Sequence, residues 1–89
     1  MTNAPAAAGT SIEAGVPKPP GAAQSVMVTP SDPTYAVVAY AGSPGALALL
    51  HQSGSGWTLL AEGSPQLPCV NGLPVEVETD LLGRMQACG

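Results

Sequence analysis

Three short apolar runs fill the middle of the chain, at residues 35–41, 46–51 and 57–61. The connectors between them, residues 42–45 and 52–56, are rich in glycine and serine. Apolar runs of about five to seven residues separated by such connectors are typical of an antiparallel meander. We therefore predict three consecutive strands and expect them to nucleate the fold.

The first two of these strands are apolar on both sides. Tyr35 and Val37 fall on one face of the first strand, and Val38 and Tyr40 fall on the other. Strands of this kind are covered on both faces or lie at an interface. We expect the C-terminal segment to supply one cover. The leading strand, the N-terminal segment or a second copy of the molecule could supply the other.

A leading strand is expected at residues 25–29, before a turn at residues 31–34. Asp32 can bond its neighbouring backbone and Pro33 fixes φ, which favours a tight turn into the meander.

The closing segment favours a helix over about residues 74–82, although residues 75–79 also alternate as in a strand. Pro74 suits the first helical position, acids follow in the first turn, and Gly83 suits the stop. On a helix we expect one apolar stripe, made of Val75, Val77, Leu81 and Leu82.

The two cysteines, Cys69 and Cys88, bracket this last segment. Their spacing matches no zinc pattern, so one disulfide is the natural interpretation, against two unrelated thiols in a cytosolic protein. A closed loop of about 20 residues would contribute roughly 3 kcal/mol. An oxidising, extracytoplasmic location follows as an expectation.

Residues 1–24 contain seven alanines, four prolines and three glycines, and Ile12 and Val16 are the only sizeable apolar side chains after Met1. This composition predicts a disordered tether, and residues 25–89 are then one small α+β domain. We expect a three- to four-stranded antiparallel meander with one C-terminal helix, stapled by one disulfide. No signal-peptide pattern is present in the tether, so export would require a signal or anchor outside this chain.

Charge and motifs exclude several classes of function. Lys18 and Arg84 stand against six acids, a net charge of −4, which is unsuited to nucleic acid or to polybasic membrane contact. A Ser-His-Asp site would have to use His51 with Asp32 and with Ser53 or Ser55. Glu76 and Glu78 could be paired carboxylates for acid/base chemistry, but on a helix they point to different sides. No nucleophile elbow or phosphate-binding loop surrounds these residues. We expect no enzyme, cofactor or metal site.

One resemblance rests on the order of the later motifs. Gly54-Ser55-Gly56-Trp57 precedes a short strand, and Glu62-Gly63-Ser64, a cysteine, Leu73-Pro74 with an acidic helix, and a final cysteine follow. In this, residues 25–89 resemble small exported or lipoprotein-borne cell-envelope domains of actinobacteria, and the Ala/Pro/Gly segment resembles their spacers. The resemblance implies a location and carries over no functional residue.

The sequence thus favours a non-enzymatic interaction module of the bacterial cell envelope, which binds another envelope protein or itself through a strand edge or an apolar sheet face. The alternative is a lipid- or glycan-binding or sensor domain, with Tyr35, Tyr40 and Trp57 lining a shallow apolar pocket. Trp57 can also be a simple core anchor.

Overall fold

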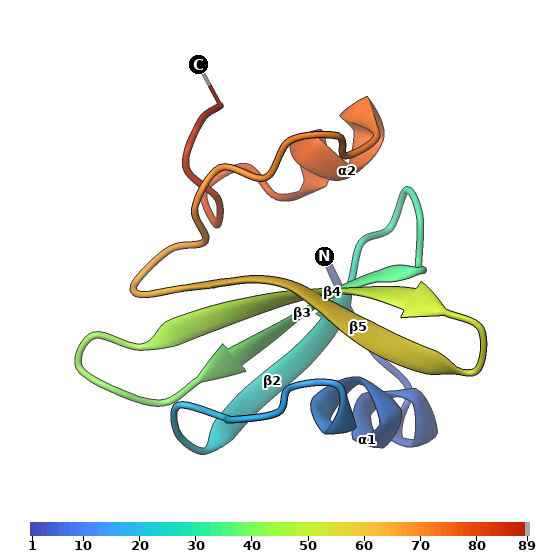
Figure 1. Cartoon of the computed structure of the whole chain (residues 1–89), viewed down its shortest axis with the longest axis vertical. Coiled ribbons are helices and arrows are strands. Elements are labelled where there is room, and N and C mark those ends of the chain that lie inside the picture. The colour runs from blue at the N-terminus through green and yellow to red at the C-terminus, as the bar shows by residue number, and fades with distance from the viewer. Residues whose placement is uncertain (89) are drawn as a thin grey trace.

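The computed structural model describes residues 1–88, which form a five-stranded antiparallel sheet with a cover on each face (Figure 1). The strands follow one another in the sheet in chain order. They are β1 (Thr2–Asn3), β2 (Ala23–Val28), β3 (Tyr35–Tyr40), β4 (Ala46–Ser53) and β5 (Gly56–Gly63). The predicted leading strand and meander are confirmed as β2 to β5.

The turn between β2 and β3 is held by Asp32, as its sequence predicts. The Asp32 Oδ1 atom accepts hydrogen bonds from the backbone N–H of Thr34 at 3.1 Å and from the Thr34 hydroxyl at 2.7 Å. These bonds favour the ionised carboxylate and hold the pKa of Asp32 below its ordinary value of 3.8. The buried Thr29 hydroxyl donates to the Asp32 carbonyl and closes the turn from the other side.

The first cover is α1 (Ala6–Ala14), which lies against one face of the sheet (Figure 1). Ile12 is fully buried and Val16 is 4% exposed, and both pack against residues of β3 and β4 such as Val38 and Leu50. One strand and one helix therefore lie in the segment predicted as a disordered tether. The predicted count of three to four strands and one helix is too low.

Small side chains explain how a segment with few large apolar residues covers the sheet. Alanine has the highest helix propensity, and a surface of alanine and glycine lets the helix come close. At the end of α1, a Cβ atom on Gly15 would lie 2.7 Å from Leu50 Cδ2 and 2.7 Å from the Trp57 carbonyl oxygen. Only glycine fits this close approach. Because the segment lies so near the sheet, Ile12 and Val16 reach the core although it has few other large side chains.

The second cover is the C-terminal cap, which we define as residues 64–88 and which contains α2 (Val75–Asp80). A helix is thus confirmed within the predicted range of about residues 74–82, although it is shorter and spans residues 75–80. Leu67, Val77 and Leu81 are fully buried against the sheet residues Tyr35 and Leu49. The Asp80 carboxylate accepts the backbone N–H of Ser31 at 2.9 Å, which ties α2 to the turn between β2 and β3.

Covalent and backbone bonds close the cap on itself. The N–H of Leu67 donates to the carbonyl of Arg84, and the N–H of Gln86 donates to the carbonyl of Leu67, each at 2.9 Å. The predicted disulfide joins Cys69 to Cys88, with a Cα–Cα distance of 5.0 Å. The two apolar faces of the sheet are therefore explained within one chain: the C-terminal segment covers one, as predicted, and the N-terminal segment covers the other.

A β-bulge lets the edge strand β5 serve both covers. Leu50 pairs with Leu59 and Leu49 pairs with Ala61, so Leu60 is the extra residue. Before the bulge, Trp57 and Leu59 face α1, and after it Ala61 faces the cap. Leu60 is left 42% exposed. Within residues 1–88, neither helix has the length and apolar character needed to cross a membrane.

Candidate interaction surface

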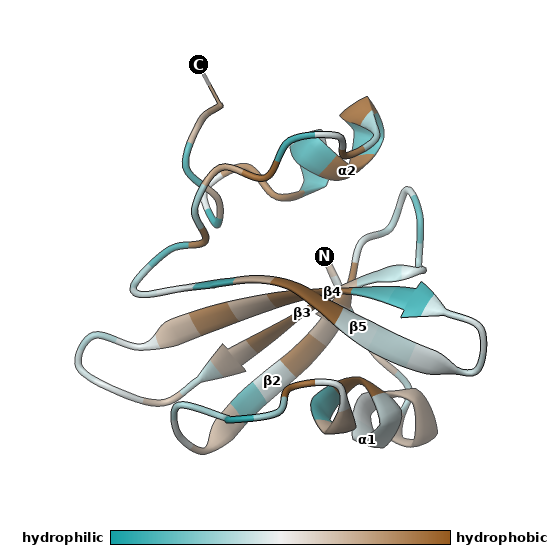
Figure 2. Ribbon diagram, viewed as in Figure 1, coloured by the Kyte–Doolittle hydropathy of each residue, from teal (hydrophilic) through white to brown (hydrophobic). Residues whose placement is uncertain are grey.

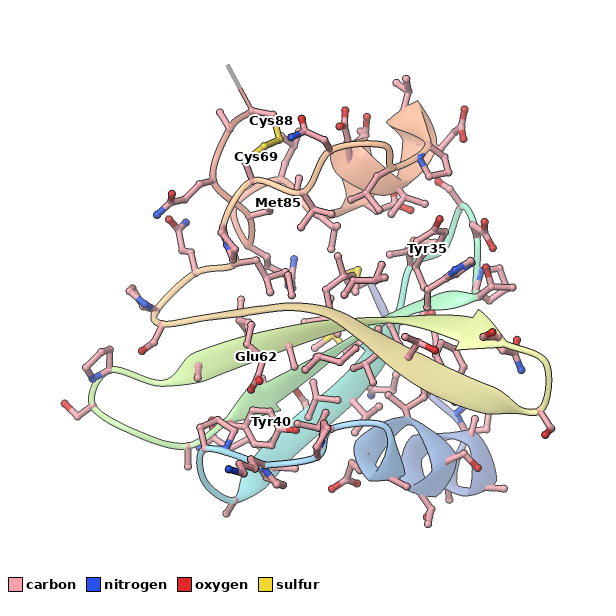
Figure 3. The ribbon with its side chains drawn as sticks, viewed as in Figure 1. Tyr35, Tyr40, Glu62, Cys69, Met85 and Cys88 are labelled. Carbon is pink, nitrogen blue, oxygen red and sulfur yellow. A yellow bond between two sulfur atoms is a disulfide. The ribbon has the colours of Figure 1, made fainter. Side chains whose placement is uncertain are left out.

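The three aromatic residues predicted as a binding surface do not come together. Tyr35 is buried on the cap side of the sheet and stacks on His51, with ring centroids 4.2 Å apart. Tyr40 is 4% exposed on the opposite side, which faces α1 (Figure 3). Trp57 is half-buried on that same side, where its backbone meets the end of α1. Tyr35 and Tyr40 serve the two cores, and Trp57 packs at the margin of one.

Tyr40 nevertheless carries an unusual polar group. Its hydroxyl is buried and has no hydrogen-bond partner among residues 1–88. Burial raises the pKa of Tyr40 above its ordinary value of 10.0, and the negative charges of Glu62 and Glu13 raise it further. Each of these influences favours the neutral phenol, so the group acts as part of the core.

The side chains considered for catalysis do not form a catalytic arrangement with one another. His51 stacks on Tyr35, and Asp32 is bonded to Thr34. Ser53 and Ser55 are exposed at the hairpin between β4 and β5. Over the described part of the chain, no group of three or more His, Cys, Asp or Glu side chains is placed to hold a metal ion.

Both edges of the sheet carry features that disfavour pairing with another strand, although β1 covers only residues 27 and 28 of β2. At one edge β1 has only two residues. At the other, β5 carries the bulge at Leu60 and the charge of Glu62, and the end of α1 lies against the Trp57 carbonyl. Short strands, bulges, charges and covering elements are the means by which proteins prevent edge-to-edge association. With both faces also covered, the sheet itself offers little surface to a partner.

The most exposed of the large apolar side chains lie instead on the cap. Leu82 is 73% exposed and Val75 is 72% exposed. This corrects the prediction of one apolar stripe on α2. Residues two positions apart on a helix differ in direction by about 200°, so Val75 cannot share a face with Val77. Val77 and Leu81 face the core, whereas Val75 on the helix and Leu82, two residues beyond its end at Asp80, are exposed on the outer side of the cap.

A groove of about 210 Å³ adjoins this outer face. Its lining consists of the side chains of Glu78, Leu81, Leu82 and Met85 together with residues 86–88. The disulfide holds one end of the lining, because Cys88 is bonded to Cys69 on the other limb of the cap (Figure 3). We call the groove together with Val75 the cap surface.

The hydropathy of the ribbon shows the contrast between the sheet and the cap (Figure 2). The brown, apolar stretches of β3 and β4 lie inside, between the two covers, while α2 alternates between brown and teal on the outside of the molecule. The groove of the cap surface is lined mainly by apolar residues and by one acid, Glu78.

Comparison of the chain with protein-family models, with curated proteins and with solved structures finds no match. The resemblance to envelope domains of actinobacteria thus stays an expectation. What the cap surface does has to be argued from its own chemistry.

Proposed function

We propose that this chain is a non-enzymatic protein–protein interaction module of the bacterial cell envelope and that it binds its partner through the cap surface. One observation carries the proposal: Leu82 and Val75 stand about three-quarters exposed beside an apolar groove. Large apolar side chains that gather on one exposed surface are typical of protein interfaces. The other large apolar residues are covered, apart from Leu60.

A protein partner suits this surface better than a small ligand. Pockets for drug-sized ligands usually have volumes of about 300–1,000 Å³ and bury most of the ligand, and the groove is smaller and open on one side. The alternative pocket around Trp57 has no observation in its favour, since Tyr35 lies on the other side of the sheet and Tyr40 is buried.

The disulfide supports the proposed location. A disulfide between Cys69 and Cys88 is consistent with an oxidising compartment outside the cytoplasm. The partner is then another envelope protein or a second copy of the chain.

Site-specific photo-crosslinking tests the proposal. A photoreactive benzoyl-phenylalanine replaces Leu82 in one variant and Leu60 in another, and each is irradiated in cells that make the protein natively. Leu60 is the matched control because it is also a partly exposed leucine, on the sheet edge. We expect a discrete adduct from position 82 and none from position 60.

The mass of the adduct also separates the two kinds of partner. An adduct of twice the chain mass identifies a second copy, and any other discrete mass identifies a different protein. No adduct from position 82, or the same adducts from both positions, would show that the cap surface is not the interface.

A further inference from the structure

We infer that the groove of the cap surface receives one apolar side chain of a partner protein, and that a lysine or arginine next to this side chain pairs with Glu78. The inference rests on the proposed function and adds the chemistry of the partner. It depends on three features: the size of the groove, the nature of its walls and the charge along its border.

Size and wall chemistry define the anchor. A space of about 210 Å³ between Leu81, Leu82 and Met85 can hold one large aliphatic or aromatic side chain. Interfaces commonly concentrate their affinity in such an anchor, which fills a small apolar pocket on the other protein. The residue that enters the groove is therefore expected to be Leu, Ile, Met, Phe or Trp.

Charge defines the neighbours of the anchor. Glu78 lines the groove and is partly exposed, and among residues 1–88 it is the only charged residue of the lining. Glu76 is exposed on the same helix. A partner with a basic residue beside its anchor complements these carboxylates, and complementary charge increases both the rate and the specificity of association.

The same charges disfavour two other occupants. A second copy placed symmetrically against the cap surface would bring its own Glu76 and Glu78 to the same interface, where like charges repel. An anionic lipid surface would meet the same carboxylates, in a chain of net charge −4. A basic, apolar segment of a different protein is the occupant that fits.

Selection from a library of random twelve-residue peptides displayed on phage tests the inference with the intact, disulfide-bonded chain. We expect enriched peptides to carry a large apolar residue within two positions of a lysine or arginine. Leu82→Ser should abolish the enrichment. Glu78→Gln should weaken the binding of a selected peptide about tenfold at low salt, and less at high salt.

Glu13→Gln is the matched control, because Glu13 is an exposed acid on α1, across the sheet from the cap. It should leave the affinity unchanged. Enriched peptides without basic residues, or equal binding by the Glu78→Gln variant, would overturn the basic-partner inference and leave the cap surface a binding surface. No enrichment above the Leu82→Ser variant would overturn both. Binding to phosphatidylglycerol vesicles that requires Leu82 would assign the surface to a membrane and also overturn the inference.

Discussion

The two covers of the sheet solve the same problem by different means. The α1 cover is a nine-residue helix with Ile12 and the nearby Val16 as its large buried side chains. The cap has a shorter helix of six residues but three fully buried large side chains, two backbone hydrogen bonds that close it, and a disulfide. One cover depends on close approach of small residues, and the other on anchors and cross-links.

This difference indicates where each cover is vulnerable. Because α1 has so few anchors, the loss of a single side chain removes a large part of its contact with the sheet. Without the disulfide, the folded cap would keep its buried anchors. The unfolded chain would gain conformational freedom, which lowers the free energy of unfolding. Three substitutions, from the largest expected effect to the smallest, test the comparison.

Ile12→Ala should have the largest effect. Deleting most of a fully buried isoleucine costs about 4 kcal/mol of unfolding free energy, by loss of burial and creation of a cavity. Denaturant unfolding followed by the fluorescence of Trp57, which lies at the end of α1, measures it. Ser11→Ala, at an exposed position of the same helix, is the control and should change little. A loss below about 1 kcal/mol from Ile12→Ala would show that α1 is not part of the cooperative fold.

Removal of the disulfide should rank second. With a sequence separation of 19 between Cys69 and Cys88, the cross-link contributes about 3 kcal/mol through the unfolded chain. Thermal melts of the wild type with and without reductant, and of the Cys69→Ser/Cys88→Ser variant, measure this loss. The variant should be insensitive to reductant, which makes it the control. Intact mass after alkylation without reductant should show no labelled thiol; two labelled thiols and an unchanged melt would mean that the staple is absent.

Hydrogen exchange of the backbone amides in the cap should also respond to loss of the disulfide. The N–H groups of Leu67 and Gln86, which close the cap, should exchange with solvent faster in the double variant. Amides of β3 and β4 should change less, because the α1 cover and the sheet do not depend on the cross-link. Equal acceleration in both regions would show that the two covers unfold as one unit.

The sequence predicted the cap better than it predicted α1, for a physical reason. In the cap, proline, acids and a glycine mark the ends of the helix, and the cysteines bracket the segment, so several independent signals agree. In α1, most residues are alanine, glycine, serine or threonine. A prediction from average composition therefore overlooks the two large apolar residues that anchor this segment. Ile12 and Val16, four positions apart, were the signal that this segment has an apolar face.

The candidate surface was missed for a different reason. Val75 and Leu82 were assigned to the same stripe as Val77 and Leu81, although the helical period places Val75 on another face and Leu82 lies beyond the last helical residue, Asp80. Applying that period would have separated Val75, which is exposed, from Val77, which is buried. The groove itself could not be predicted, because it depends on where the disulfide places residues 86–88.

Tyr40→Phe should have the smallest effect, and in the opposite direction. Tyr35 on the cap side stacks on His51, whereas the Tyr40 hydroxyl on the α1 side is buried without a hydrogen-bond partner in the described structure. Removing an unsatisfied buried hydroxyl should raise the unfolding free energy by about 1 kcal/mol. Urea titrations of the two proteins at pH 7 measure the difference, and a loss of stability of similar size would show that the hydroxyl holds an ordered water.

The same substitution should change the response to alkali. Because burial, Glu62 and Glu13 raise the folded pKa of Tyr40 above 10.0, the unfolded chain loses this proton first. The stability that the neutral phenol contributes is present below pH 10 and decreases as the pH rises through the folded value. The stability advantage of Tyr40→Phe over the wild type should therefore widen above pH 10. Tyr35→Phe, on the cap side, is the control and should retain the alkaline loss; a constant difference between the Tyr40→Phe variant and the wild type across this range would place the cause of any alkaline unfolding outside the α1 cover.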